Sequence, residues 1–600
     1  MKAISLTAAA ILVALTGCQT TNNSMEVVAT QQQTISQNQL VNDLSEQYFA
    51  ESLAMSPVYG TYLGKPNVNH KFNPPTTAET LAQSKALLQK YQAKLDQVDA
   101  SKLSGQAKLS YEILKRDLAF SLQGFEFPSH LMPINQMSGM HNIFAGFGSG
   151  QSAQPFNSVK DYQDFIQRAQ GFVVWLEGVK ANMRQGIEAG VVLPKALTKK
   201  LIPQFESHVV SDATQSVFWG PIQNFPETFS DDEKEQLTTQ YQDMVMNTLV
   251  PAYRDMSHFL NTEYLPNSRD SVGYSALPNG KAWYEYQIAN HTTLDLNAED
   301  IHQLGLEEVA RIRNEMEWVK EQMQFEGDLQ AFFQFLREDE QFYFNSADEL
   351  IAAYENVKQK IDARVPQLFD IQPKADYEVK LVEAYRAQSA AGASYAAPAP
   401  DGSRPGVFYI NGHNLKAQPK FLVETLSIHE AAPGHHFQIA LQQEVEGLPS
   451  FRKFGGYTVF AEGWALYAES LGKSLGLFTD PMMWYGRLVD EQLRAMRLVV
   501  DTGIHAKGWS REQAIEFMLD NSSMAESDVT AEVERYIGWP GQAVSYKVGQ
   551  FKIQELRDYS EKALGDKFDI KAFHSQILID GALPMPILED KIKHWVHSQI

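Results

Sequence analysis

Three histidines and one glutamate stand within eight residues of this chain: His429, Glu430, His435 and His436. Neutral imidazole is the commonest protein ligand for zinc, and a neighbouring carboxylate can accept a proton from a metal-activated water. The stretch reads HEAAPGHH. It is a longer form of H-E-x-x-H, in which two histidines one helical turn apart bind zinc and the glutamate is the general base. The pattern predicts a zinc-dependent hydrolase, and among hydrolases a peptidase.

The spacing departs from that motif, because Pro433 stands where the second histidine would be. In a regular helix, His435 would point about 120° away from His429, and His436 would lie about 10 Å further along the axis. Proline breaks a helix, and Gly434 tolerates dihedral angles that other residues avoid, so we expect a bulge that returns a histidine to the metal. His435 is the first choice for the second ligand and His436 the alternative. The competing interpretation is that these histidines cap or pack a kinked helix.

The third ligand is expected from the segment 457–469, which reads YTVFAEGWALYAE. Apolar residues surround almost its whole circumference, which is typical of a buried helix. Its carboxylates, Glu462 and Glu469, are seven residues apart and therefore share a face. An unpaired carboxylate is costly to bury, so each needs a metal, a cation or a hydrogen-bond donor. We predict that Glu462 is a zinc ligand. Glu469 is expected to form a hydrogen bond with the imidazole of a zinc ligand, or an ion pair with a nearby arginine. An internal salt bridge is the alternative.

The predicted mechanism uses four side chains. His429, His435 and Glu462 hold one Zn²⁺ per chain, and water takes the fourth position, where the metal lowers the pKa of that water towards neutrality. Glu430 accepts its proton and passes it to the leaving amine. A zinc hydrolase of esters or non-peptide amides would use the same residues. A non-catalytic, metal-free binding lipoprotein is the other alternative, and the interrupted motif favours it.

Together these motifs resemble the bacterial family known as domain of unknown function 885. That family is distantly similar to the helical zinc peptidases (gluzincins) represented by carboxypeptidase Taq, oligopeptidases and angiotensin-converting enzyme. The resemblance covers most of the chain and implies a mainly α, zincin-like fold, with a small β element beside a deep active-site cleft. In the better-known relatives the H-E-x-x-H motif is uninterrupted. Further matching segments are GYSALPNG at 273–280, NHTT at 290–293, RPGVFYIN at 404–411, RLVVDTGIH at 497–505 and PGQAVSY at 540–546.

Most of the chain has the periodicity of amphipathic helices, and strand-like sequence is scarce. The clearest strand covers 407–410, after a glycine and before an Asn-Gly turn, just upstream of a helix expected from about Pro419 through His429. In the related peptidases such a strand borders the cleft, so the resemblance implies that Phe408 and Tyr409 bind a peptide backbone at its edge. A structural hairpin is the alternative. The best predicted helices are 80–98, 298–326, 347–364, 484–500 and 511–519.

A phenol could stabilise the oxyanion that develops beside the metal. Tyr546 and Tyr536 flank a proline break after which a helix is expected to restart, and we favour Tyr546. Related peptidases use a tyrosine or histidine in this way, downstream of the third ligand. His505 is a further candidate, either as a hydrogen-bond donor to the oxyanion or as a residue that holds a metal ligand in place. Asp501 is a candidate for holding a metal ligand.

A polar stripe runs along the predicted helix 484–500 and continues to Asp501 and His505. Such a stripe faces either water or a polar cleft, and we favour a surface position for Arg494. If the enzyme releases C-terminal residues, an arginine must bind the free carboxylate. Arg404, Arg487 and Arg497 are candidates that the sequence does not rank.

The N-terminus predicts a lipoprotein. Residues 1–17 have the basic start and short apolar core of a signal peptide, and LTGC at 15–18 resembles a bacterial lipobox with Cys18 as the lipidated residue. The residue after it is Gln19, where an aspartate would favour the inner membrane, so we expect the periplasmic side of the outer membrane. Residues 18–37 are polar and predict a flexible tether. Cys18 is the only cysteine, which excludes disulfides within the chain.

Composition narrows the remaining possibilities. The net charge of −22 argues against nucleic-acid binding, since phosphate contacts need a basic surface. A hydrophobic content of 44% is ample for a large core, and no linker or repeat divides residues 38–600. We therefore expect one helical metallopeptidase-like domain of two lobes around a cleft. Its expected substrates are short or unfolded peptides, and no obligate protein partner is predicted.

Overall fold

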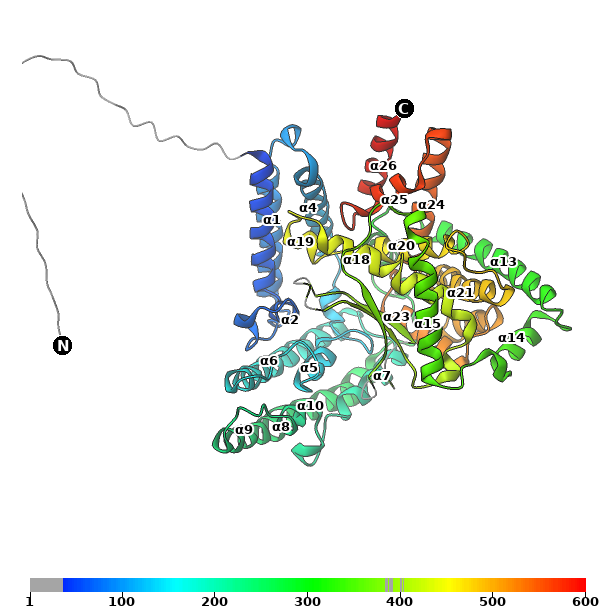
Figure 1. Ribbon diagram of the computed structural model, residues 1–600. Helices are drawn as coiled ribbons and strands as arrows, with labels where there is room; N and C mark the ends of the chain where they lie inside the picture. The colour runs from blue at the N-terminus through cyan, green and yellow to red at the C-terminus, as the bar shows by residue number, and fades with distance from the viewer. Residues whose placement is uncertain (1–35, 384–386, 388–391, 400–401, 403) are drawn as a thin grey trace, which may run out of the picture. The chain divides into compact units, whose positions relative to one another are not determined.

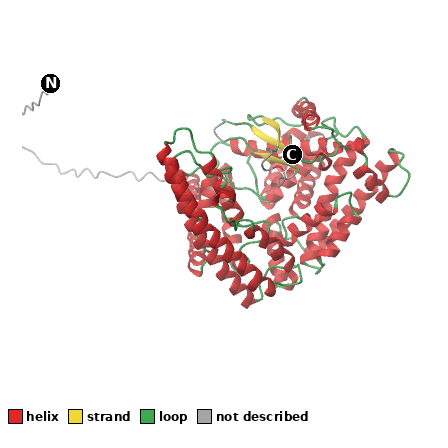
Figure 2. Ribbon diagram, turned by 90° about the horizontal axis from the view of Figure 1, so that it is seen from below, coloured by secondary structure: helices red, strands yellow, loops and turns green. Residues whose placement is uncertain are grey.

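The computed structural model describes residues 36–383, 387, 392–399, 402 and 404–600. Residues Gln37–Ile600 form one compact unit. The predicted signal peptide, Cys18 and nearly all of the predicted tether lie outside the described residues. Among the described residues, no helix combines the length and apolar character needed to cross a bilayer. Helices dominate, and the named strands of the described chain form one small sheet (Figure 2), so the predicted mainly α fold is confirmed.

The N-terminal helices pack around a small core of their own. Residues Val41, Tyr91 and Leu118 are fully buried where α1, α3 and α4 meet. Helix α3 starts at a capping box between Thr77 and Thr80, which satisfies backbone N–H groups that the first turn leaves free. The helices around this core are α1 (Gln37–Ala54), α3 (Ala78–Leu95) and α4 (Gly105–Gly124). Helices α2 (Pro57–Tyr62) and α5 (Met140–Gly148) contribute Val58 and Phe144 to the next core.

The next group of helices buries an aromatic core. Phe144, Phe172 and Tyr253 are fully buried there, and the rings of Phe144 and Phe172 stack with their centroids 4.0 Å apart. Two π-helical segments, Met244–Leu249 and Leu260–Tyr264, join the last helices of the group end to end. The α-helices are α6 (Val159–Ala189), α7 (Lys195–Glu206), α8 (Gly220–Gln223), α9 (Asp231–Asp243), α10 (Val250–Phe259) and α11 (Leu265–Asn267).

Four helices precede the sheet: α12 (Gly280–Thr292), α13 (Ala298–Gln322), α14 (Leu329–Glu338) and α15 (Ala347–Asp362). Helix α13 packs along α21, and α15 packs against β1. The helices predicted at 80–98, 298–326 and 347–364 are present as α3, α13 and α15, and each ends a few residues earlier than predicted.

The sheet has three strands, β1 (Tyr377–Leu381), β2 (Ala393–Ala396) and β3 (Gly406–Ile410), in the order β1-β3-β2. β3 pairs in parallel with β1 and antiparallel with β2. The strand predicted at 407–410 is therefore present, but it lies in the middle of the sheet. β2 is an edge strand, and it lies against the helical turn that carries His429.

The C-terminal part supplies the long buried helices. Helix α20 crosses α24 at two glycines: a Cβ on Gly463 would lie 2.5 Å from the backbone of Gly549, so only glycine permits this approach. The elements are α17 (Val423–Leu426), α18 (His435–Glu444), α19 (Ser450–Lys453), α20 (Thr458–Ser470), α21 (Pro481–His505), α22 (Arg511–Asp520), α23 (Glu526–Gly538), α24 (Ser545–Leu564), α25 (Ile570–Leu578) and α26 (Met585–Gln599) (Figure 1).

Candidate metal centre

The helix that carries His429 ends in a bulge. A π-helical turn, Ser427–Ala431, holds His429 and Glu430, and at Ala432 the backbone is extended, with φ −115° and ψ 132°. Helix α18 then begins at His435. The predicted helix is thus broken where the sequence indicates, and the break changes the direction in which the second histidine points.

Gly434 is required in this bulge because the chain folds back on itself. The Gly434 N–H donates to the Ile428 carbonyl at 2.9 Å, and a Cβ at this position would lie 2.0 Å from the carbonyl oxygen of His429. Its φ is −78°, so close approach and not a left-handed conformation is the reason for glycine. The indole N–H of Trp464 donates to the Pro433 carbonyl at 2.8 Å and fastens the bulge to α20.

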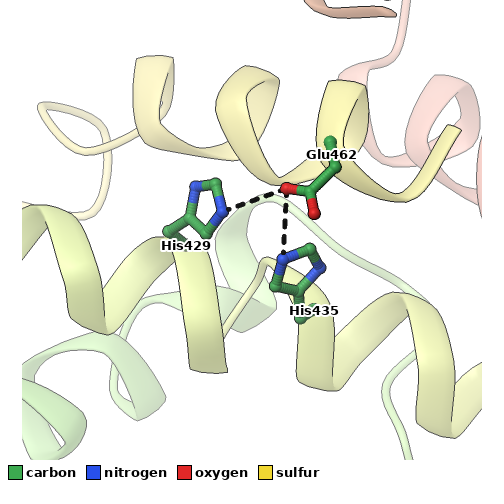
Figure 3. A group of neighbouring side chains, drawn as sticks. All are labelled: His429, His435 and Glu462. Atoms are coloured by element: carbon green, nitrogen blue, oxygen red, sulfur yellow. Dashed lines mark ion pairs between the residues drawn. The ribbon is translucent and has the colours of Figure 1, made fainter. Parts of the chain in front are cut away.

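The bulge brings His429 and His435 to the same carboxylate (Figure 3). Glu462 Oε2 lies 3.4 Å from Nε2 of His429 and 3.5 Å from Nε2 of His435. The two imidazole rings are nearly perpendicular, with their centroids 4.8 Å apart. Three residues from three elements therefore point their ligand atoms at one small volume.

A second carboxylate of α20 contacts the far side of His429. Glu469 Oε1 lies 2.7 Å from Nδ1 of His429, and both side chains are buried. With the proton on Nδ1 donated to Glu469, the lone pair of Nε2 faces Glu462. The seven-residue spacing of the two glutamates along α20 thus places the imidazole between them, and Glu469 occupies the place predicted for it.

The electrostatics of this group favour a positive charge at its centre. Burial by itself would lower the pKa of His429, but the charges of Glu462 and Glu469 outweigh burial and raise it well above its usual value. Burial would raise the pKa of Glu462, yet the imidazoles of His435 and His429 hold it well below its usual range. Each shift comes from oppositely charged neighbours in a buried environment: two carboxylates beside His429, and two imidazoles beside Glu462.

The donor set fits zinc. Two ligands about 2.1 Å from a tetrahedral zinc lie about 3.4 Å from each other, which is close to the separations found between Glu462 and the two imidazoles. Oε2 of Glu462 and Nδ1 of His435 are buried without a hydrogen-bond partner among the described residues. A buried carboxylate oxygen without a donor is costly, and a bound cation would remove that cost.

Glu430 follows His429 on the same turn and is half-buried. Burial raises the pKa of the Tyr354 phenol, and the negative charge of the nearby Glu430 carboxylate raises that pKa further. The general base predicted from the sequence therefore stands beside a metal-ligand candidate and beside a buried phenol that the sequence did not single out.

His436, the alternative ligand, lies away from this group. Its Nδ1 is 2.8 Å from the hydroxyl of Tyr395 on β2, and a hydrogen bond also joins the ring to the backbone of Ala375. Burial lowers the pKa of His436 to about 4. The bulge turns His435 towards Glu462, and His436, the next residue along α18, faces the sheet.

The polar stripe of α21 faces the interior, so the surface position favoured for Arg494 is wrong. Arg494 is buried and forms an ion pair with Asp490, and ligand atoms of Asp490, Glu469 and His429 lie within 4.8 Å of one another. Arg494 thus contacts the metal-ligand candidate His429 indirectly, through Asp490, which lies close to Glu469 and His429. Asp490 lies four residues before Arg494, and this spacing was the signal in the sequence that could have identified it.

The two candidate tyrosines have different environments. Tyr536 is fully buried, and its hydroxyl donates to Glu532 and lies 3.1 Å from Nε of Arg497. Tyr546 is half-buried under Arg497, whose guanidinium lies 4.5 Å from the ring centroid, and its hydroxyl accepts from Gln542 at 3.4 Å. The O–H proton of Tyr546 has no acceptor in these contacts, whereas that of Tyr536 is committed to Glu532.

His505 and Asp501 hold the backbone of neighbouring elements, which contradicts the roles predicted for them. His505 Nδ1 accepts from the Tyr274 N–H at 3.2 Å, and Nε2 lies 3.0 Å from the Tyr536 carbonyl, so neither nitrogen is free for an oxyanion. Asp501 accepts from the Gly541 N–H at 3.0 Å and from the hydroxyl of Tyr284. Asp501 thus holds the turn that precedes α24, and His505 joins the segment at Tyr274 to the last turns of α23.

The predicted substrate strand is also corrected. β3 uses both of its edges for β1 and β2, so Phe408 and Tyr409 have no free backbone edge to offer a peptide. Phe408 is buried and packs edge-on against Tyr354 at 5.3 Å. The sequence signal of β2, ASYA, was too short and too weakly apolar to be recognised as a strand.

The three arginines proposed for a substrate carboxylate differ in availability. Arg404 is exposed and donates to the Ala397 carbonyl at 2.6 Å, and Arg487 pairs with Glu491. Arg497 pairs with Glu532 through Nε and Nη2, while its buried Nη1 has no partner among the described residues. Arg487 likewise keeps a buried Nε without a partner among the described residues, so these contacts leave Arg487 and Arg497 as equal candidates.

The comparisons with known proteins place the chain in a family. Residues 57–592 match the family described as "Bacterial protein of unknown function (DUF885)", and the chain belongs to that family. A search of curated proteins gives no match.

Two solved structures share the fold. One is "the putative lipoprotein from Colwellia psychrerythraea", 30% identical, with a TM-score of 0.87 over 94% of this chain and 100% of that one. The other is "a putative lipoprotein of unknown function from Shewanella oneidensis", 19% identical, with a TM-score of 0.74 over 92% of this chain and 99% of that one. The architecture described above is thus found in related bacterial proteins.

Proposed function

We propose that this protein is a zinc-dependent hydrolase that cleaves short or unfolded peptides. The observation that carries the proposal is the convergence of His429, His435 and Glu462 on one point, at separations that suit tetrahedral zinc. Glu469 behind His429 adds support, since a carboxylate on the outer nitrogen of a ligand imidazole is the usual arrangement in zinc sites.

Each residue has a role in this proposal. Zinc, when bound, supplies a Lewis acid that lowers the pKa of a water molecule and polarises a carbonyl. Glu430 accepts a proton during attack and returns it to the leaving amine. Tyr546 donates its O–H to the developing oxyanion, because Gln542 leaves that proton free. Arg497 and Arg494, above its ring, favour negative charge nearby.

The edge strand β2, in place of β3, is the proposed site of the peptide backbone. β2 pairs with β3 on one side and lies against the turn Ser427–Ala431, which carries His429 and Glu430. An extended peptide that added to its outer edge would pass the metal group through main-chain hydrogen bonds, without dependence on side chains.

Metal analysis and one substitution test the proposal. The purified protein is expected to hold about one zinc per chain and to cleave members of a synthetic peptide library, with activity lost to a chelator and restored by zinc. Glu430→Gln should keep the zinc and lose nearly all turnover. Glu446→Gln, at an exposed position after α18, is the matched control and should cleave at the wild-type rate.

Two results would contradict the proposal. A protein without zinc after purification and dialysis against it would remove the metal assignment. A Glu430→Gln variant with full activity would remove the general base. A protein that binds zinc and cleaves esters but no peptide would retain the site and replace the substrate class.

We also propose that Cys18 carries a lipid that anchors the protein to the periplasmic side of the outer membrane. The lipobox LTGC and the description of the 30% identical relative as a putative lipoprotein support the anchor, and Gln19 supports the outer membrane. Radiolabelled palmitate should be incorporated into the wild type and not into Cys18→Ser, and the wild type should fractionate with outer membranes. Equal labelling of both proteins would overturn the anchor.

A further inference from the structure

A cavity of about 460 Å³ begins at the metal-ligand candidate Glu462. Its walls come from helices that also carry the metal group. On α18, Gln438, Ile439 and Gln442 line it, and these positions lie three, four and seven residues after His435, on the same helix face. The volume is in the range of pockets that bind small ligands.

The second wall belongs to α20, the helix that carries Glu462. Thr458 lines the cavity four residues before Glu462, on the same face of the helix, and Ala461, the residue before Glu462, lines it as well. Tyr59 and Leu63, from the N-terminal part of the chain, line it as well. The cavity therefore shares Glu462 with the metal group and is bounded by parts of the chain that are far apart in sequence.

Two glutamines of the lining, Gln438 and Gln442, already form hydrogen bonds within the protein. Gln442 Nε2 donates to the carbonyls of Arg452 and Gly455 at 2.8 and 2.9 Å. Gln442 Oε1 accepts from the Ala582 N–H at 3.0 Å and from Gln438 Nε2 at 2.9 Å. These two amides have few hydrogen bonds left for an occupant.

The two tyrosines of the lining are committed in the same way. The Tyr59 hydroxyl donates to the Phe454 carbonyl at 2.9 Å, and that of Tyr457 donates to Asp117 at 2.6 Å. These two tyrosines and two glutamines therefore offer a polar occupant few replacements for its hydrogen bonds to water, which is unfavourable for its binding.

The rest of the lining is mainly apolar. It includes the exposed Phe454 and the half-buried Leu63 and Ile439, and its neutral polar side chains are Gln443 and Thr458. The charged side chains of the lining are Glu462, which faces the two imidazoles, and Lys453, whose long stem can keep its ammonium group in water.

We infer that this cavity is the subsite for an apolar side chain of the substrate, next to the bond that is cleaved. The inference rests on the proposed function, because it takes the metal group as the place of cleavage. The occupant is a leucine, isoleucine, methionine or phenylalanine side chain, and Ile439 determines how large it can be. One methylene in such a pocket changes selectivity by about 10-fold or more.

Two opposite substitutions of Ile439 test the inference. Wild-type cleavage of a peptide library should show enrichment of large apolar residues at one position beside the scissile bond. Ile439→Phe fills the cavity and should move that preference towards alanine by about 10-fold in kcat/KM ratio. Ile439→Ala enlarges it and should favour phenylalanine.

A second substitution that fills the cavity from outside α18 separates the effect of filling from that of a disturbed α18. Gly456 lines the cavity in a conformation open to other residues, and a Cβ there meets no atom within 4 Å. Gly456→Leu should move the preference in the same direction as Ile439→Phe. Leu441→Phe is the matched control: Leu441 is a half-buried apolar residue of α18 outside the lining, and its cleavage profile should equal the wild type's.

A second readout does not need turnover. In the Glu430→Gln background, peptides that differ only in alanine or leucine at the enriched position should bind with dissociation constants that differ about 10-fold, measured by calorimetry. Adding Ile439→Phe should abolish the difference.

The outcomes separate the two proposals. If the protein binds zinc and cleaves peptides, but the profile shows no apolar position or stays unchanged in both filling variants, the subsite is refuted and the proposed function stands. If no peptide is cleaved by the zinc-loaded wild type, the proposed function fails, and the subsite fails with it.

Discussion

At the residue scale, His429 occupies a position between two carboxylates of one helix, Glu462 on Nε2 and Glu469 on Nδ1. The outer carboxylate fixes which nitrogen carries the proton, and the inner one fixes where a cation is favoured. Asp490 lies close to Glu469 and His429, and Arg494 forms an ion pair with Asp490. The orientation of the imidazole is therefore set by the protein and does not depend on the metal alone.

Glu469→Gln should lower zinc affinity by about 10- to 100-fold, because the amide keeps the size of the side chain but loses the negative charge behind His429. Competition with a chromophoric chelator measures the affinity. Glu534→Gln removes another buried carboxylate, which lies on α23 and pairs with Arg511 of α22, and should leave the affinity unchanged. Equal affinities for Glu469→Gln and the wild type would show that Glu469 does not support the ligand.

Tyr546→Phe should lower kcat by about 10²- to 10³-fold and change KM little, because an oxyanion donor acts only as the transition state forms. Steady-state kinetics with a cleaved peptide would give both constants. Tyr536→Phe is the comparison: it loses the hydrogen bond to Glu532 inside the protein, so the melting temperature should fall more clearly than kcat. The reverse ranking of the two variants in kcat would transfer the role to Tyr536.

At the element scale, the bulge between the π-helical turn Ser427–Ala431 and α18 decides which histidine reaches Glu462. The Gly434 N–H bond to Ile428 closes the bulge, and Trp464 fastens it to α20. A small change in this backbone would rotate His435 away, since the direction of every side chain in α18 depends on where the helix starts.

Gly434→Ala should therefore abolish tight zinc binding while most of the fold remains. A Cβ at this position would lie 2.0 Å from the His429 carbonyl oxygen, so the bulge cannot close as it does with glycine. Metal analysis after gel filtration, together with circular dichroism, measures both effects. Gly146→Ala, where the added Cβ meets no atom within 4 Å, should bind zinc like the wild type. Full zinc content in Gly434→Ala would show that the bulge tolerates a side chain.

The buried stripe of α21 has an explanation at the same scale. Helices α13, α22, α23 and α24 all contact α21, so no face of it remains for water along most of its length. Its charged residues are satisfied by partners on those helices, such as Glu491 with Lys547 at 2.6 Å and Arg497 with Glu532 at 2.9 Å. A stripe of charged residues along a helix can thus indicate buried ion pairs with neighbouring helices, and not only a solvent-exposed face.

At the scale of the whole molecule, buried histidines make stability depend on pH. Burial lowers the folded-state pKa of several histidines to about 4, whereas in the unfolded chain they protonate near pH 6.5. Between these values the unfolded state binds more protons, so the free energy of unfolding should fall as the pH decreases from 6.5 to about 4. The residues are His141, His208, His291, His436 and His574.

Urea unfolding of the chelator-treated protein across this pH range measures the effect without a contribution from metal release. His208 packs among aromatic rings, with the ring of Tyr253 at 4.5 Å, so His208→Phe should keep the packing and remove one titrating group. The slope should become shallower by up to about 1.4 kcal/mol per pH unit. An unfolding midpoint that does not change between pH 6.5 and 4.5 would contradict the prediction.

The sequence determined what depends on local chemistry. The periodicity of apolar residues placed α3, α13, α15 and α21, because amphipathic helices repeat every three to four residues wherever they pack. The break after His429 and the shared face of Glu462 and Glu469 followed from proline and from helix geometry. These inferences need no information about distant parts of the chain.

Tertiary structure decided what depends on contacts between distant segments. Both edges of β3 are occupied because β1 and β2 pair with it, and Arg494 is buried because four other helices cover α21. His435 and not His436 faces Glu462 because the bulge is fastened to α20 by Trp464. Residues far apart in sequence meet only after the chain has folded, and their meeting is governed by packing and hydrogen bonding that no local pattern contains.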